Sequence, residues 1–102
     1  MKKQKRKLTD FELAVFEETK KIPKGEVSTY AEIAKRIRKP GAARAVGNAL
    51  NKNPWAPVVP CHRVIKSDGT VGGFASGTKK KIALLKKEGV RIEKGAVAGF
   101  EK

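Results

Sequence analysis

The sequence predicts a mainly α-helical single domain with a short β-hairpin, similar to a winged helix-turn-helix. Three observations lead to this fold class. The chain has 102 residues, a length typical of one domain. Two short segments with helical spacing are joined by the tight turn Pro40-Gly41. Further along, Asp68-Gly69 lies between β-branched residues, which indicates a hairpin or wing.

The first helix is predicted from about Asp10 to Lys21. Thr9 and Glu12 have the spacing of a capping box, in which each side chain bonds to the backbone N–H of the other residue. A Pro-Lys-Gly turn at residues 23–25 ends the helix. Residues 1–8 form a basic tail, which is either a flexible, solvated end or an additional phosphate contact.

The two helices of the helix-turn-helix come next. Thr29 and Glu32 form a second possible capping box at the start of the first, and residues 38–41 interrupt it. The second is predicted from Ala42 to Leu50 and is rich in alanine and glycine. Small side chains allow its backbone to lie close to a neighbour, which is either the protein core or DNA.

Residues 58–65 are predicted to form an extended, buried strand, because β-branched side chains flank the central cysteine. After a turn at residues 66–70, Val71 would begin the return strand of the wing. The sequence therefore predicts that these two segments pair as the short β-hairpin.

The last helix is predicted from Lys79 to Glu88. Thr78 is its expected cap and Gly89 its expected end. Residues 90–92 are a candidate strand. The folded domain is thus expected to span residues 9–92, with a loose tail at 93–102.

The chain is strongly basic, with 24 Lys and Arg against 10 Asp and Glu and a formal charge of +14. This charge favours a polyanionic partner, nucleic acid ahead of an anionic membrane. No apolar run approaches the ~20 residues that span a bilayer, and no secretion signal follows the basic start. We expect a monomer of the cytoplasm, associated with the nucleoid and not secreted. One cysteine without a Cys/His cluster predicts no internal disulfide and no zinc site. We also expect no cofactor.

The only cysteine, Cys61, precedes the only histidine, His62, and Arg63 adds positive charge beside them. A thiol needs a nearby base or positive charge to become a nucleophilic thiolate. Adjacent residues of an extended strand point to opposite faces, so a bridging water is the alternative to a direct hydrogen bond between Cys61 and His62. Glu88 is the candidate carboxylate that orients His62. Taken singly, an inert buried thiol and a structural histidine are the ordinary interpretations.

The pentapeptide Pro60-Cys61-His62-Arg63-Val64 resembles the active-site signature of the O6-alkylguanine-DNA alkyltransferases. Further segments match that family in order and at similar spacing. They are Glu26-Val27-Ser28-Thr29-Tyr30, Ala42-Ala43-Arg44-Ala45-Val46-Gly47, Asn53-Pro54, Gly72-Gly73-Phe74 and Leu84-Leu85-Lys86-Lys87-Glu88-Gly89. The resemblance covers nearly the whole chain between the tails, and the ordered set is much more specific than any one segment.

The resemblance implies a DNA repair protein that reverses O6-alkylguanine damage in duplex DNA. The alkyl group would pass irreversibly to Cys61 after base flipping, so that each molecule acts once. His62 would act as the base through a water, with Glu88 orienting it. Asn53 would hold the hinge between the recognition helix and the active-site segment.

The resemblance also implies how DNA is bound. Arg44 would enter the base stack from the minor groove and fill the space of the flipped nucleotide. Tyr30 would crowd the adjacent phosphate and give a hydrogen bond or proton to the guanine. Three small residues would let the same helix approach the groove: Ala42, Ala43 and Gly47.

The substrate pocket would be built around the extruded guanine. Carbonyls of Cys61 and Val64 would accept from its amino group, the N–H of Ala75 would meet O6, and Phe74 would stack as a wall. The remaining expected pocket residues are Gly72, Gly73, Arg63 and Lys81.

Structural explanations stay open for each assignment: Arg44 as a solvated helix residue, Tyr30 as a core aromatic, Asn53 as a turn former, Glu88 as a lysine partner. Two other functions also stay open, a lesion-sensing DNA-binding protein and a basic RNA- or ribosome-associated protein. The resemblance bears on the first, because alkyltransferase-like proteins that bind lesions without repair have tryptophan in place of the cysteine. The family usually adds an N-terminal domain, and Phe74 stands where many members have tyrosine.

Overall fold

The computed structural model describes residues 8–55, 58–72 and 77–100. In these residues the helices are α1 (Asp10–Lys20), α2 (Tyr30–Arg36), α3 (Ala43–Asn51) and α4 (Thr78–Lys87), with a single 3-10 turn, η1 (Cys61–Arg63). The strands are short: β1 (Ser28–Thr29), β2 (Val64–Ile65), β3 (Ile92–Glu93) and β4 (Ala96–Val97). The predicted mainly helical fold class is confirmed. Residues 1–7 of the basic tail and the predicted pocket residues Gly73, Phe74 and Ala75 lie outside the described residues.

The helix starts follow the local sequence to different degrees. The capping box of α1 is complete, because Glu12 N–H donates to Thr9 Oγ1 and Thr9 N–H donates to Glu12 Oε1, both at 3.0 Å. At α2, Glu32 N–H donates to Thr29 Oγ1, but the Glu32 carboxylate accepts from Arg36 at 2.9 Å instead. The prediction that Thr78 caps α4 is wrong, since that helix begins at Thr78 and its N-cap has no side-chain hydrogen bond.

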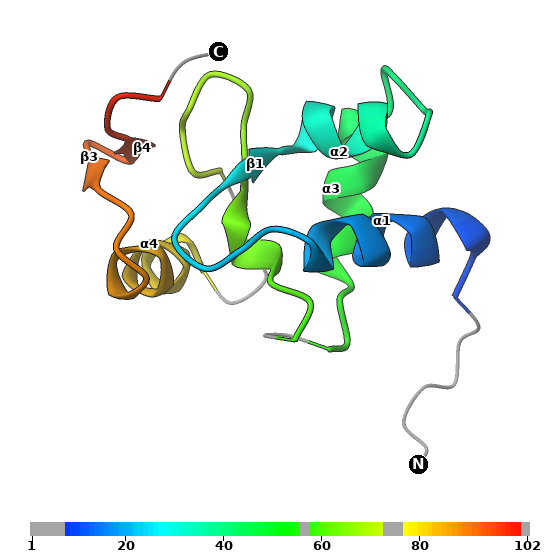
Figure 1. Cartoon of the computed structure of the whole chain (residues 1–102), viewed down its shortest axis with the longest axis horizontal. Helices are drawn as coiled ribbons and strands as arrows, with labels where there is room; N and C mark the ends of the chain where they lie inside the picture. The colour runs from blue at the N-terminus through cyan, green and yellow to red at the C-terminus, as the bar shows by residue number, and fades with distance from the viewer. Residues whose placement is uncertain (1–7, 56–57, 73–76, 101–102) are drawn as a thin grey trace.

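The core has two parts that meet at β2. Helices α1, α2 and α3 surround one cluster, which includes Val64. Helix α4 and the C-terminal strands surround the other, which includes Ile65. Because neighbouring residues of a strand point to opposite faces, β2 places one side chain in each part. In Figure 1 the strands β1 and β2 accordingly lie between the three-helix group and α4.

The predicted strand over residues 58–65 is wrong in its first part. Pro60 has φ −82° and ψ 68°, and Cys61 N–H donates to Val59 O at 2.8 Å, which is an inverse γ-turn. The 3-10 turn follows, and only Val64–Ile65 pair, in parallel with β1. Two facts explain the difference: proline has no N–H for a ladder, and β1 offers only two residues to pair with.

The predicted hairpin also differs in its partner. The turn forms, since Lys66 N–H donates to Thr70 O and Gly69 has φ 92°. Thr70 then bridges to Ala96 of β4 rather than continuing along β2. The antiparallel hairpin is made by β3 and β4.

The prediction of a loose tail from residue 93 is therefore wrong for the part that the structure describes. Glu93 pairs with Ala96, and Ile92 pairs with Val97. Phe100 packs on the second core cluster, and Gly69 lies directly beneath its ring. The C-terminal segment thus completes the half of the domain that holds α4.

Candidate active site

Cys61 belongs to the core cluster that α1, α2 and α3 surround, and 8% of its surface is exposed. Tyr30 and Lys81 come to it from α2 and α4. The Nζ atom of Lys81 donates to Tyr30 Oη at 3.3 Å and lies 5.6 Å from the centre of the tyrosine ring. Three chemically active groups from distant parts of the sequence therefore share one buried place.

Burial sets the electrostatics of this place. Lys81 is completely buried, and desolvation lowers its pKa to about 8, although the nearby Cys61 charge acts in the opposite direction. Burial also raises the pKa of Tyr30, and the Cys61 charge adds to that shift. Tyr30 thus keeps its proton at neutral pH, while Lys81 is a cation that can lose its charge in mild alkali.

His62, the residue after Cys61 in the 3-10 turn, belongs to a second group of polar side chains. His62 is 3% exposed, and its Nε2 lies 3.0 Å from Oε2 of Glu88. Arg63 holds the same carboxylate with two bonds, Nε to Oε1 at 2.9 Å and Nη2 to Oε2 at 2.8 Å. The Arg63 bonds, followed by those of His62, lower the pKa of Glu88 to about 2. The carboxylate is therefore ionised over the whole physiological range.

This contact indicates which ring nitrogen of His62 donates a hydrogen bond to Glu88. An ionised carboxylate can only accept hydrogen bonds, so Nε2 of His62 carries the proton that Glu88 receives. The basic nitrogen is then Nδ1. Among the described residues no hydrogen bond joins His62 to Cys61 Sγ, so a proton passing between them needs an intermediary such as water.

Arg63 has a different place from the one expected. Its guanidinium is occupied by Glu88 and by the carbonyl of Ile22, to which Nη1 donates at 2.8 Å. It therefore clamps the end of α4 to the end of α1, rather than lining the expected pocket. The ionic clamp is mostly buried, with 16% of the Arg63 side chain and 14% of the Glu88 side chain exposed.

Asn53 joins α3 to the active-site segment. Its Nδ2 donates to Val59 O, and its Oδ1 accepts from Trp55 N–H, both at 2.8 Å. Trp55 in turn packs edge-on against Phe16 of α1, at 5.6 Å between ring centres. The loop before Cys61 is thus held at both ends.

Of the expected pocket residues that the structure describes, Lys81 and Gly72 lie near Tyr30. Val64 is completely buried on β2. Gly72 has φ 74°, and a Cβ there would stand 3.1 Å from Lys66 Cγ and 3.8 Å from Tyr30 Oη. A side chain at this position would be strained and would crowd the tyrosine hydroxyl.

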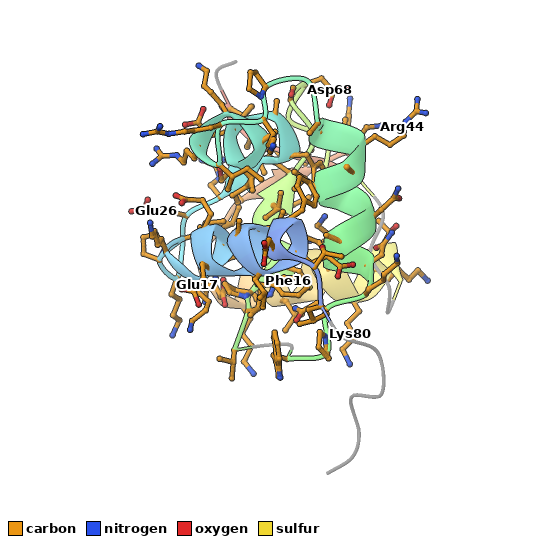
Figure 2. The ribbon with its side chains drawn as sticks, turned by 90° about the vertical axis from the view of Figure 1, so that its right-hand side faces the viewer. Phe16, Glu17, Glu26, Arg44, Asp68 and Lys80 are labelled. Atoms are coloured by element: carbon orange, nitrogen blue, oxygen red, sulfur yellow. The ribbon has the colours of Figure 1, made fainter. Side chains whose placement is uncertain are left out.

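The expected DNA-binding residues lie on or beside α3. Arg44 is exposed and points outward, on the side of the view in Figure 2 opposite to Glu26. Ala42, Ala43 and Gly47 are half-buried, and a Cβ at Gly47 would touch the Tyr30 ring at 3.8 Å. The small residues therefore bring the outer face of α3 close to the partly buried Tyr30.

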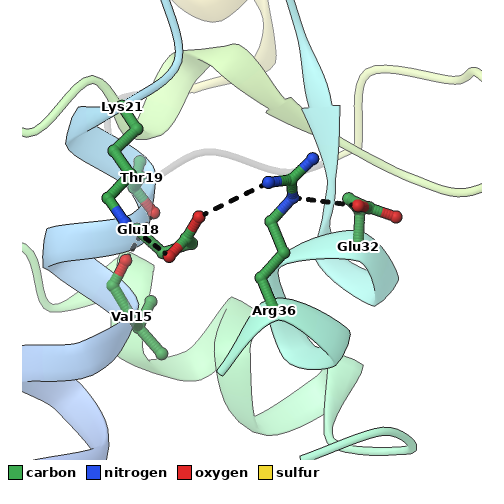
Figure 3. A network of polar contacts seen from close by, with 6 residues as sticks. All are labelled: Val15, Glu18, Thr19, Lys21, Glu32 and Arg36. Carbon is green, nitrogen blue, oxygen red and sulfur yellow. Dashed lines mark hydrogen bonds and ion pairs between the residues drawn. The ribbon is translucent and has the colours of Figure 1, made fainter. Parts of the chain in front are cut away.

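One hollow of the surface lies apart from the Cys61 group. It has a volume of about 580 Å³ and lies between α1, α2 and β1, where Glu18, Glu32 and Phe100 are among its walls. Arg36 crosses it and contacts both glutamates, at 3.9 Å and 2.9 Å (Figure 3). None of its lining residues belongs to the Cys61 group, so we place the reaction centre by its side chains and not by this hollow.

The described ranges contain neither a metal-binding cluster nor a membrane-spanning helix. No set of three or more His, Cys, Asp or Glu side chains there is arranged to hold a metal ion. In the same ranges no helix has the length and apolar character needed to cross a bilayer.

Residues 10–90 match the family model described as 6-O-methylguanine DNA methyltransferase, DNA binding domain. The chain belongs to this methyltransferase family. Among curated members, the methylated-DNA–protein-cysteine methyltransferase of Methanosarcina acetivorans is 54% identical over 81 residues, which cover 79% of this chain and 52% of the relative. The corresponding protein of Methanothermobacter thermautotrophicus is 44% identical over 85 residues, 83% of this chain and 47% of the relative. The chain thus spans about half the length of the curated relatives it matches.

Solved structures of the family have the same fold. The Mycobacterium tuberculosis OGT in complex with DNA aligns with a TM-score of 0.78 and 49% identity, over 80% of this chain and 51% of that one. Schizosaccharomyces pombe Atl1, in complex with damaged DNA containing O6-carboxymethylguanine, aligns with a TM-score of 0.77 and 37% identity, over 86% and 83%. The aligned residues of this methyltransferase-family chain thus cover about half of the OGT chain and most of the Atl1 chain.

Sequence reasoning missed two features of the site. The first is the depth of Lys81, which follows two exposed lysines and so suggests a solvated run. Its position four residues before the buried Leu85 is the signal that places it on the inner face of α4. The second is the Arg63 clamp, for which the sequence has no local signal because the partners lie 25 and 41 residues away.

Proposed function

We propose that this family member repairs O6-alkylguanine in duplex DNA by transferring the alkyl group to Cys61. The observation that carries the proposal is that Cys61 adjoins two polar pairs: it precedes His62, which is paired with Glu88, and it interacts electrostatically with Tyr30 and Lys81, which bind each other. One pair can take the proton of the nucleophile. The other can give a proton to the leaving group. Alkyl transfer from an aromatic ether needs both.

The first half of the reaction produces the thiolate. The thiol proton of Cys61 passes through a water to Nδ1 of His62, and the ionised Glu88 stabilises the resulting imidazolium. The charge of Lys81 favours the thiolate in a site that is nearly dry. Arg63 fixes the position of Glu88, so that the base is held before substrate arrives.

The second half is the displacement. Sγ attacks the alkyl carbon, the S–C bond forms and the C–O6 bond breaks, with its electron pair remaining on guanine. Tyr30 donates a proton to the departing guanine, which matches the proton that His62 has taken from Cys61. Lys81, in contact with Tyr30 Oη, stabilises the negative charge that develops there. The thioether product has no bond that water can hydrolyse, so each molecule reacts once.

The substrate reaches this buried site only as an extruded nucleotide. Arg44 points away from the protein body on α3, which supports a role in which its side chain would fill the vacated position in the stack. The half-buried small residues of α3 leave room for the groove walls. Exposed Lys and Arg side chains add affinity that depends on salt and not on sequence.

The rival function is binding of the lesion without transfer, because the similar structure of Atl1 is a complex with damaged DNA containing O6-carboxymethylguanine. The two functions differ in the fate of the lesion. We expect the protein to convert O6-methylguanine in a duplex oligonucleotide to guanine, in an amount equal to the amount of protein. Cys61→Ala is expected to bind the same duplex with unchanged affinity and to leave the lesion intact. A wild-type protein that binds the lesion tightly and never alters it would establish the sensing function instead.

A further inference from the structure

The turn between α2 and α3 contains a strained residue. Arg38 has φ 66°, the left-handed region that favours glycine. Arg38 N–H donates to Lys35 O at 3.0 Å, and Lys39 N–H donates to Ala34 O at 2.8 Å. This pattern is a Schellman motif, and Arg38 occupies the position where most such helix ends have glycine.

The same motif ends α4 with the usual residue. Gly89 has φ 95°, Gly89 N–H donates to Lys86 O, and Val90 N–H donates to Leu85 O, both at 3.0 Å. The hydrogen bonds are equivalent at the two helix ends, so the backbone of the α2–α3 turn does not need an arginine. A non-glycine residue held in this region costs stability, and such a cost points to a role outside the fold.

The side chain of Arg38 is available for that role. Arg38 is exposed and makes no ion pair or side-chain hydrogen bond with any described residue, and the same holds for the neighbouring Lys35 and Lys39. Arg36, by contrast, lines the hollow between α1, α2 and β1, where Glu18 and Glu32 bind it (Figure 3). The turn thus keeps three unpaired cations together, although carboxylates lie close by on α1 and α2.

The position of the turn indicates the partner. Helix α3 begins directly after it, and Arg44 is the second residue of that helix. We propose that Arg38 binds a backbone phosphate of the duplex next to the point where Arg44 enters, and that the strained conformation is retained for this contact. The inference rests on the proposed DNA repair function. Guanidinium is suited to the task, because its planar donors bind two phosphate oxygens at once.

Three variants test the proposal. Arg38→Gly removes both the charge and the strain, Arg38→Lys keeps both, and Lys94→Gly is the matched control. Lys94 is the other non-glycine residue with positive φ, at 53°, among the described residues, and it lies between β3 and β4. Each protein is examined by thermal melting and by titration with a duplex that contains O6-methylguanine, at several salt concentrations.

We expect Arg38→Gly to melt a few degrees higher than wild type. It should bind the duplex about five- to tenfold more weakly at about 0.1 M salt, and the slope of log K against log salt should fall by about 1. Lys94→Gly should also melt higher and bind as wild type does. Arg38→Lys should keep the wild-type salt slope without the gain in melting temperature. Transfer to a free alkylated guanine should be unchanged in all three.

Two results would overturn the inference. One is an Arg38→Gly protein that keeps the wild-type affinity and salt slope. The other is an Arg38→Gly protein that melts lower than wild type, which would show that the arginine stabilises the turn. Failure of the proposed function is distinct from both, because the wild-type protein itself would then show no salt-dependent binding of duplex DNA.

Discussion

The residues proposed to carry the reaction and the helix proposed to face DNA differ in how their polar side chains are placed. Around Cys61, the polar groups are buried or mostly buried and bind one another, as in the His62–Glu88–Arg63 set. On α3, Arg44 and Asn48 are exposed and have no partner among the described residues. Chemistry needs groups that are fixed before the substrate arrives. Recognition needs groups whose partners are supplied by the nucleic acid.

We expect the largest effect from replacing the mostly buried carboxylate of Glu88 with an uncharged amide. Glu88→Gln leaves Arg63 without its ionic partner and gives the imidazolium no counter-charge. We expect transfer to slow by about 100-fold or more, while duplex binding changes little. Single-turnover kinetics and a binding titration measure the two effects.

Glu93→Gln is the matched control for this change. Glu93 pairs with Arg91 at 3.4 Å, but both side chains are more than half exposed, at 65% and 81%. Exposed ion pairs contribute little, so this variant should behave as wild type in every assay. Equal losses in the two variants would contradict the claim that burial makes the Glu88 carboxylate important.

Arg44→Ala tests the role proposed for the exposed Arg44 side chain on α3. Extrusion of a nucleotide costs a few kcal/mol, so removal of the residue that fills the gap should slow transfer from duplex DNA by about 10- to 100-fold. Attack on a free O6-alkylguanine base should stay at the wild-type rate, because the reaction centre is untouched. Arg91→Ala, on the C-terminal hairpin, is the control. A loss of equal size on both substrates would exclude the proposed intercalating role of Arg44.

The dependence of stability on pH tests how burial affects the charge of Lys81. The pKa of Lys81 in the folded protein is about 8, below its ordinary value of 10.5, so the unfolded chain binds more protons between these values. The cost of burying the charge is therefore fully present below about pH 8 and disappears as the pH rises towards 10.5. Lys81→Met should be more stable than wild type at neutral pH, by about 2–3 kcal/mol, and the difference should vanish in alkali. A pH-independent difference in melting would contradict this account.

The smallest expected effect is a loss of stability when the glycine that ends α4 is replaced by alanine. Gly89→Ala forces a Cβ into the left-handed region where φ is 95°, although no atom lies within 4 Å of the new carbon. Backbone strain alone should lower the free energy of unfolding by about 1–2 kcal/mol. Denaturant titration measures the change. An unchanged midpoint would show that the end of α4 relaxes easily, and would weaken the comparison with Arg38.

The sequence predicts the helices well because their signals are local. The capping box of Thr9 and the positive-φ glycine at residue 89 lie within a few residues of the groups they bond. The turn at Cys61 is not predictable in this way, since its shape depends on how much of β1 is available for pairing. The same holds for Thr70, whose partner Ala96 lies in a segment with no strong strand pattern.

For the site, the resemblance identifies the chemistry and the structure supplies the contacts. The pairing of His62 with Glu88 follows from the need for an orienting carboxylate. The contact of Lys81 with Tyr30, and the clamp made by Arg63, join residues far apart in sequence. Such contacts depend on packing between the two halves of the core, which no local pattern encodes.

The central claim is that Cys61 accepts the alkyl group. The direct measurement is mass spectrometry of the tryptic peptide 53–63, which contains the only cysteine, after reaction with an excess of O6-methylguanine duplex. The account predicts that this peptide gains the mass of one CH2 group, to a limit of one per protein, with fragment ions that place it on Cys61. An unmodified peptide beside an intact lesion would contradict it.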